Sequence, residues 1–389
     1  MNVSCIPNRA LVTEAPDVFI AGAGPAGLAC AIAAALQGLQ VTIADGMKPP
    51  IDTACGEGLM PDALATLSEL GITLNSTGPT ESALLRGIRF IDDATPCGRP
   101  AKTEAAFPEA PGRGIRRTLL HQLLLDRAAA LGVQFHWQTV VRRIDGPQIH
   151  TNQRTFRARW IVGADGPQSR IRACAGLDKA SISSRRIGLR QHFAITPWTD
   201  FVEVYWTNRA QAYVTPISSG EICIAFVATE KFASIQQALS LFPTLKLRLA
   251  FAPPTDTPLG SITLTRRLHR VTSGNIALIG DASGSVDAVT GEGLALCFRQ
   301  ALALAQALKA ENLEAYEHAH RKIHRIPRLM SRTMLLMDTY PIVRSRTLST
   351  FQLRPALFSH LLHVHIGHTQ VRLPGAIGLL ASVLCFLGN

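Results

Sequence analysis

The chain of 389 residues is too long for one small domain and can form two domains with a large shared interior. Hydrophobic residues make up 47% of it and charged residues 17%, a balance that excludes an intrinsically disordered protein. The formal net charge of +11 leaves two interpretations open, the binding of anions such as nucleotide phosphates or acidic lipids, and a solvated basic surface.

The cysteines and the two chain ends give a first expectation about location. The eight cysteines are scattered and form no CxxC pair, so we expect reduced thiols. The N-terminal residues lack the apolar core of a signal peptide, which predicts a cytoplasmic protein. Residues 376–388 are apolar, but a membrane-spanning helix needs about 20 such residues. This segment either docks on the protein or makes peripheral membrane contact.

The first elements form one βαβ unit. Residues 17–21 predict a buried parallel strand, residues 28–36 an alanine-rich helix and residues 40–45 a second strand. Between the first strand and the helix lies a GxGxxG turn, whose glycines permit a tight turn, close approach of a pyrophosphate, and close packing of helix on strand. The free N–H groups of the helix N-terminus favour that pyrophosphate.

An acidic residue completes this nucleotide site. Asp45 ends the second strand about 20 residues downstream of the turn and can accept bonds from ribose hydroxyls. An acid at this place disfavours a 2′-phosphate, so we expect FAD or NAD and not NADP here. The predicted binding residues are Gly22, Gly24, Pro25, Ala26, Gly27 and Asp45.

Farther along the chain, the pattern alternates between helices and strands. We predict a turn-rich stretch at 46–61, a helix at 62–70 and strand-like runs at 75–112. These are followed by a helix at 117–131 and by strands at 133–137, 140–144 and 156–163. Alternating strands at 188–195, 201–206, 211–217 and 221–227 predict an antiparallel sheet. Helix and loop then lead to a buried strand at 275–279, a long helix that begins near Gly293, and a helical C-terminal third.

These elements predict an α/β fold in three parts. A Rossmann-like FAD-binding domain comprises residues 15–74, 113–178 and 270–310. A second domain with an antiparallel sheet comprises residues 75–112 and 179–269 and holds the substrate. A helical region covers residues 311–389.

Two later strand ends carry further motifs. Residues 163–170 read GADGPQSR, and residues 280–284 read GDASG, with Thr290-Gly291-Glu292-Gly293 and a helix after them. Together with the first turn, these motifs resemble the single-component (group A) FAD-dependent monooxygenases and the related geranylgeranyl reductases, over residues 15–330. ACGEGLMP (54–61) and GDASGSVDAVTGEG (280–293) resemble a bacterial branch associated with type III polyketide synthases. Many relatives have proline at the position of Ala288, so the path of that loop stays open.

The resemblance implies how FAD is held. The first motif would hold the adenosine diphosphate, and Asp281 the ribityl chain. Asp165 would support flavin and pyridine nucleotide, and Arg117, in R-x2-L-x3-L-x3-A-x3-G, would contact FAD. The loop with Gly56 and Glu57 would border the flavin. Backbone N–H groups at Gly291, Gly293 and Leu294 would face its pyrimidine ring. NAD(P)H would be a co-substrate without a Rossmann domain of its own.

The antiparallel sheet should wall the substrate pocket. By strand alternation Arg190 and His192 share one face, and so do Tyr213 and Thr215. His192 or Tyr213 could bond a phenol hydroxyl, and His192 could remove its proton; the alternative for each is a structural role. Cys55 is either a reactive or a packed thiol.

The sequence gives less support for a metal site than for a flavin site. His318, His320 and His324 have the spacing of metal ligands on one helix, but no acid or cysteine completes a site. We therefore expect a solvated basic face and no metal.

Three functions stay open. The first is an NAD(P)H- and O2-dependent monooxygenase that hydroxylates a phenolic or polyketide-type aromatic substrate. The second is an FAD-dependent reductase of isoprenoid double bonds. The third is a non-catalytic, flavin-bound module that binds a membrane or a partner. We expect a small-molecule substrate and no nucleic acid partner.

Overall fold

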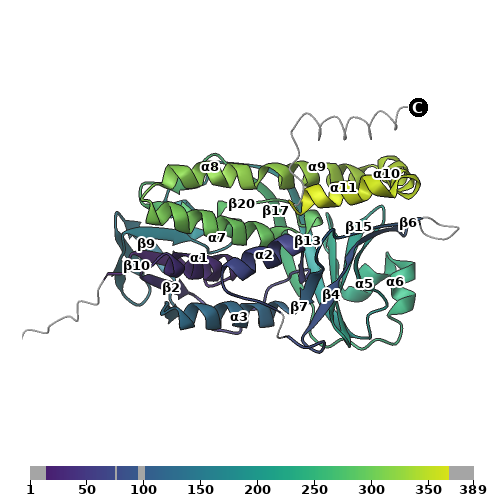
Figure 1. The fold of residues 1–389 in the computed structure, drawn as a ribbon, viewed down its shortest axis with the longest axis horizontal. Helices are drawn as coiled ribbons and strands as arrows, with labels where there is room; N and C mark the ends of the chain where they lie inside the picture. The colour runs from purple at the N-terminus through teal and green to yellow at the C-terminus, as the bar shows by residue number, and fades with distance from the viewer. Residues whose placement is uncertain (1–14, 75–76, 95–100, 368–389) are drawn as a thin grey trace, which may run out of the picture.

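A parallel sheet forms one side of the molecule in the computed structural model, which describes residues 15–74, 77–94 and 101–367 (Figure 1). Its order is β18-β19-β12-β1-β2-β8. These strands are β18 (Thr272–Ser273), β19 (Ile276–Leu278), β12 (Trp160–Gly163), β1 (Val18–Ala21), β2 (Val41–Asp45) and β8 (Gln134–Trp137). The strands from β19 to β8 run parallel, and β18 pairs antiparallel with β19 at the edge. The predicted βαβ unit is confirmed.

Three helices pack near this sheet: α1 (Pro25–Leu36), α3 (Arg117–Ala130) and α7 (Gly293–Lys309). Alanine and glycine along α1 allow close packing, and α1 contacts both α3 and α7. The helix begins at Pro25 and not at residue 28, because proline is favoured at the first helical position, where its missing N–H needs no partner.

The register of the parallel sheet brings the sequence motifs to one edge. Ala21 at the end of β1 lies opposite Ala44 and Gly163, and Gly163 lies opposite Leu278. The turns that follow these strand ends are therefore neighbours, at the carboxyl edge where open α/β sheets bind ligands.

A second sheet has the order β20-β17-β13-β16-β15-β14-β5-β6. Its strands are β5 (Gly87–Asp92), β6 (Ala101–Ala106), β13 (Ala180–Ala194), β14 (Phe201–Trp206), β15 (Ala210–Ser218), β16 (Glu221–Ala228), β17 (Leu259–Leu268) and β20 (Gly284–Ser285). The four predicted antiparallel strands are present, but the sheet is mixed because β14 pairs parallel with β5. The prediction of helix and loop before residue 275 was incomplete, since β17 lies there and pairs with β13.

The single strand predicted at 156–163 is also corrected. It divides into β11 (Thr155–Arg157) and β12. β11 pairs with β10 (Gln148–Thr151), and β10 also pairs with β9 (Val141–Asp145). β12 instead belongs to the parallel sheet, where it pairs with β1. A separate small sheet has the order β3 (Gly58–Leu59), β7 (Gly112–Ile115) and β4 (Ser82–Leu85).

The C-terminal helices run along one side of both large sheets, at the top of Figure 1. They are α8 (Leu313–Ile323), α9 (Arg325–Thr339), α10 (Pro341–Leu353) and α11 (Pro355–His365). The remaining elements are α2 (Pro61–Glu69), α4 (Arg170–Cys174), α5 (Ile235–Ser240), α6 (Pro243–Arg248) and the 3-10 turns η1 (Gly280–Ser283) and η2 (Ala288–Thr290). In the part of the chain that the structure describes, none of the helices could cross a bilayer. The apolar segment 376–388 lies outside the described residues.

The expected solvated histidine face is wrong for two of its three residues. His318 is exposed, but His320 and His324 are 3% and 1% exposed. Their rings pack against each other at a tilt, Nε2 of His320 lies 3.0 Å from Ser283 Oγ, and His324 contacts Gln300, so the two histidines support the GDAS turn. Burial lowers the pKa of His320 to about 3, which keeps it neutral.

Candidate active site

One cavity of about 1120 Å3 extends from the carboxyl edge of the parallel sheet to the space beneath α9 and α11. Its first end is formed by the three strand-end motifs, and its second end by apolar side chains of the mixed sheet and the C-terminal helices. Among the residues that line it are all the predicted cofactor-binding residues except Gly27: Gly22, Gly24, Pro25, Ala26, Asp45, Gly56, Glu57, Arg117, Asp165, Asp281, Gly291, Gly293 and Leu294.

The three glycines of the first turn differ in what surrounds them. Gly22 has a φ of 107°, and a Cβ on it would lie 2.4 Å from the oxygen of Ala164. A Cβ on Gly27 would lie 1.9 Å from the oxygen of Gly22, so this glycine serves the packing of α1. A Cβ on Gly24 would meet nothing within 4 Å. The second glycine thus borders open space, as expected where a pyrophosphate approaches the backbone.

Asp45 and a histidine that the sequence analysis missed fix this turn. Asp45 accepts hydrogen bonds from the N–H groups of Ala23 and Met47, each at 2.7 Å. Its carboxylate keeps further lone pairs for ribose hydroxyls. On the other side, Nε2 of His121 lies 2.9 Å from the oxygen of Ala23. Burial lowers the pKa of His121, so the neutral ring can donate to that carbonyl.

The donors and acceptors at this end fit FAD. Arg117 is 6% exposed, and within the described residues its Nη1 has no hydrogen-bond partner, which suits a phosphate oxygen. Among the described side chains none caps the N-terminus of α1 or of α7, so both helices present free N–H groups to the cavity. The side chain of Asp281 is exposed to the cavity, which lies deep within the protein. This enclosure by protein raises the pKa of Asp281 more than the charge of Arg266 lowers it.

Asp165 connects the second motif to a helix. Its Oδ2 accepts from the N–H groups of Arg170 and Ile171 at 2.7 and 3.2 Å. Its Oδ1 is buried and, among the described residues, has no partner. Asp165 therefore holds α4 with one oxygen and leaves the other for a ligand in the cavity.

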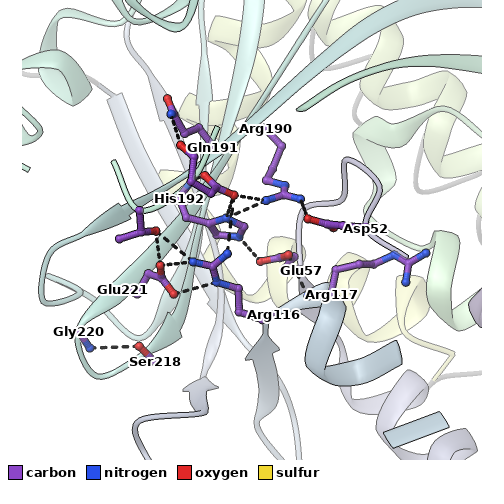
Figure 2. A network of polar contacts seen from close by, with 12 residues as sticks. Asp52, Glu57, Arg116, Arg117, Arg190, Gln191, His192, Ser218, Gly220 and Glu221 are labelled. Atoms are coloured by element: carbon purple, nitrogen blue, oxygen red, sulfur yellow. Dashed lines mark hydrogen bonds and ion pairs between the residues drawn. The ribbon is translucent and has the colours of Figure 1, made fainter. Parts of the chain in front are cut away.

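Glu57 has a strained backbone conformation, and both oxygens of its carboxylate have partners. Its φ of 58° is rare for a residue with a side chain. Its Oε1 accepts from the N–H of Arg117 at 2.9 Å, and its Oε2 lies 2.5 Å from Nε2 of His192 (Figure 2). Strain of this kind persists only where the surroundings dictate it. The contacts of Glu57 therefore fix the loop that borders the cavity.

His192 is 0% exposed and is not among the residues that line the cavity. Its Nδ1 lies 2.6 Å from Oδ2 of Asp256, so each ring nitrogen faces a carboxylate. Direct contact with a substrate would require this network to open. This geometry favours the structural alternative for His192, in which the ring positions Glu57.

Arg190 extends the network to the cavity wall. It donates to Asp256 at 2.6 Å and to Asp52 at 2.7 Å. Figure 2 shows its guanidinium between His192 and Asp52, and both Arg190 and Asp52 line the cavity. The shared face predicted for Arg190 and His192 is confirmed by the 2.8 Å between Nη1 of Arg190 and Nδ1 of His192. Both atoms also lie 2.6 Å from Oδ2 of Asp256, which therefore joins the two side chains.

Tyr213 and Thr215 line the cavity together, as strand alternation predicts. The hydroxyl of Tyr213 lies 2.9 Å from Oε1 of Gln211 and 3.1 Å from the oxygen of Val289, and its one hydrogen serves these acceptors. Burial raises the pKa of this hydroxyl. Burial also raises the pKa of the Cys55 thiol, which favours the packed, unreactive thiol over the reactive one.

The second end of the cavity is an apolar chamber. Its wall combines side chains of the mixed sheet with methionines, leucines and phenylalanines of the helices. Members are Ile88, Phe90, Val202, Val204, Met330, Met334, Met337, Phe351, Phe358, Leu361 and Leu362. The chamber was not predicted, because the sequence gives no signal that the helical region closes over the sheet.

Glu292 is a second residue that the sequence analysis passed over. It lies in the T-G-E-G turn, is 2% exposed, and lines the cavity where α7 begins. Within the described residues, neither of its carboxylate oxygens has a hydrogen-bond partner. The signal for Glu292 in the sequence is an acid between two glycines, shortly after the GD motif.

Curated proteins with similar sequences include both reductases and hydroxylases. The chain is 26% identical to a digeranylgeranylglycerophospholipid reductase of Methanothermobacter thermautotrophicus, over 73% of the chain and 74% of that protein. It is 29% identical to a ubiquinone hydroxylase of Rhodospirillum rubrum, over 76% of the chain and 72% of that protein.

The fold is shared with solved flavoproteins. The structure of the flavin-dependent brominase Bmp2 matches with a TM-score of 0.77 at 19% identity, over 90% of this chain and 93% of that one. A sequence model of the FAD binding domain family matches residues 15–244, which is more than half of the chain. The chain therefore belongs to the FAD binding domain family and is an FAD-dependent oxidoreductase.

Proposed function

We propose that the chain is an NAD(P)H- and O2-dependent monooxygenase that hydroxylates a phenolic ring bearing a long apolar chain. The observation that carries this proposal is the continuity of the cavity from the FAD end to the apolar chamber. A ring at the junction would lie beside the N-terminus of α7, and its apolar chain would extend among Phe358, Leu361 and Leu362.

The residues of the chain divide the work between the two ends. Arg117 and Asp281 would hold the phosphate and ribityl parts of FAD, and free N–H groups of α7 would lie beside its ring. When bound, FAD supplies electron transfer from NAD(P)H and the activation of O2. The apolar wall orients the substrate and excludes water, which protects such chemistry from side reactions.

The two relatives support different parts of this proposal. One is named a ubiquinone hydroxylase, which agrees with oxygen transfer to a ring. The other is named for a digeranylgeranyl lipid, which agrees with an apolar chain. A reductase of isoprenoid double bonds is therefore the second candidate, favoured by the scarcity of polar groups in the chamber. The association with polyketide synthesis stays a prediction.

One experiment separates the two candidates. The purified chain with FAD is given NADH or NADPH, and O2 uptake is followed with 4-octylphenol, with phenol, and without either. We expect 4-octylphenol to stimulate O2-coupled oxidation and to gain one hydroxyl group. Loss of a double bond from geranylgeraniol under anaerobic conditions, without stimulation by 4-octylphenol, would replace the monooxygenase with the reductase.

A further inference from the structure

Glu292 occupies the junction between the FAD end and the apolar chamber. It precedes α7, between Gly291 and Gly293, and the surrounding cavity wall includes Thr290, His365 and Leu362. A buried carboxylate normally bonds to several donors. Here, within the described residues, both oxygens have none, although the side chain is only 2% exposed. The carboxylate therefore has its hydrogen-bonding capacity free for whatever fills the cavity.

His365 is the nearest charged or titratable group. Its Nδ1 lies 3.6 Å from Oε2 of Glu292, and its Nε2 lies 3.1 Å from the oxygen of Thr290. A carbonyl oxygen can only accept, so Nε2 carries a hydrogen. In the neutral ring Nδ1 is then the unprotonated nitrogen, and it faces Glu292. The two atoms lie just beyond hydrogen-bond distance, so a small movement of either side chain would bring them together for proton exchange.

Two other charged groups lie farther behind this pair. Arg299 of α7 and Asp62 of α2 form an ion pair with each other. Arg299 is therefore already engaged and does not neutralise Glu292 directly. The pKa of Glu292 is raised to about 7, mainly by burial and to a smaller extent by Asp62, against the lowering effects of His365 and Arg299.

We propose that Glu292 and His365 form a proton-exchanging pair, in which Glu292 removes the proton from the hydroxyl group of the substrate ring. The O–H bond breaks, its electron pair stays on the oxygen, and the proton goes to a carboxylate oxygen of Glu292. From there it can pass to Nδ1 of His365. This assignment rests on the proposed function for its substrate class, and the step itself consumes no oxidant.

Other titratable groups near the junction are less suited to this role. The hydroxyl of Tyr213 serves Gln211 and the oxygen of Val289. His192 lies behind Glu57, with both nitrogens against carboxylates. Glu292 lines the cavity, its oxygens have no hydrogen-bond partner among the described residues, and His365 lies beside it as a proton acceptor.

Glu292→Gln keeps the shape of the side chain and removes its charge. Glu69→Gln, on the exposed face of α2, is the matched control. We measure the hydroxylation of 4-octylphenol against pH, together with FAD content and anaerobic reduction by NAD(P)H. A carboxylate base becomes active as pH rises through about 7, because deprotonation creates the reactive form. Glu292→Gln should lose this rise and at least about 100-fold of the rate. It should retain FAD and its reduction, and Glu69→Gln should behave as wild type.

His365→Gln supplies a second, independent variant. Its amide can still donate to the oxygen of Thr290, but it removes the group that lowers the pKa of Glu292. The rise in rate should therefore move to higher pH. A wild-type rate and pH profile in Glu292→Gln would overturn the proposal, as would an unmoved profile in His365→Gln.

A readout without turnover separates this inference from the proposed function. In the full chain labelled with carbon-13 at glutamate carboxyls, one resonance should titrate near pH 7 and vanish in Glu292→Gln. A Glu292 resonance that titrates near the ordinary value of 4.5 would refute the pair, whatever the substrate is. If 4-octylphenol is not hydroxylated but the resonance titrates near pH 7, the proposed function fails and the unusual carboxylate remains.

Discussion

Glu57 and His192 lie 135 residues apart in the sequence, yet their side chains meet at 2.5 Å. Both are almost fully buried. A buried charge that loses its partner costs much more than the intact pair contributes. At the scale of single residues, the network around His192 therefore acts as a support that keeps the loop of Glu57 against the cavity.

His192→Ala should destabilise the chain by roughly 3–5 kcal/mol, because it leaves the Glu57 carboxylate buried with one partner fewer. Urea unfolding of the full chain at pH 7 measures this change. The double substitution Glu57→Gln with His192→Ala should cost less than His192→Ala alone, since no unpaired charge remains. Additive losses in the double variant would show that the two side chains are not coupled.

At the scale of elements, strands were predictable where one rule governed them. Buried β1 and β2, and alternating β13 to β16, follow from apolar runs and from period-two patterns. β17 was missed because its half-exposed serines, threonines and arginines give no such pattern. The run at 156–163 was read as one strand because hydropathy does not record that β11 and β12 belong to different sheets.

The site, too, could be predicted only where a single rule applies. The glycines and acids that follow strands could be placed because parallel strands end at one edge. The partners of Glu57 and Glu292 could not, because His192 and His365 reach them through tertiary packing over 135 and 73 residues. No local pattern encodes such distances.

Two glycines of the same turn offer an element-scale test. Gly27→Ala should destabilise the chain by about 1–3 kcal/mol, because its Cβ would lie 1.9 Å from the oxygen of Gly22. Gly24→Ala should leave the free energy of unfolding nearly unchanged, because its Cβ meets nothing within 4 Å. It should instead weaken FAD binding by about tenfold or more, since the methyl group enters the space of the pyrophosphate. Urea unfolding and FAD titration measure both effects, and equal behaviour of the two variants would contradict the assignment.

At the scale of the whole molecule, the cavity depends on all parts of the fold. The parallel sheet supplies its polar end, the mixed sheet one wall, and α9 and α11 the cover (Figure 1). The FAD binding domain model ends at residue 244, so the chamber combines family elements with the later helices. The domain limits drawn from the sequence stay a proposal.

A series of 4-alkylphenols tests the chamber. Burial of each added CH2 group contributes about 0.8 kcal/mol, so kcat/KM should rise up to about fourfold per carbon until the chamber is full. Leu361→Trp, which shortens the chamber, should stop the rise at a shorter chain. Leu247→Trp, 80% exposed on α6, is the control and should leave the series unchanged. If kcat/KM in the wild type does not change with the length of the alkyl group, the chamber is not the place where the alkyl group binds.

The most direct test of the account is a titration of the purified full chain with FAD, followed by the flavin absorbance and by equilibrium dialysis. The account predicts one FAD bound per chain, with affinity that falls in Arg117→Ala, because Arg117 lines the cavity and its Nη1 has no hydrogen-bond partner among the described residues. A chain that stays colourless and binds no FAD at saturating concentration would contradict it.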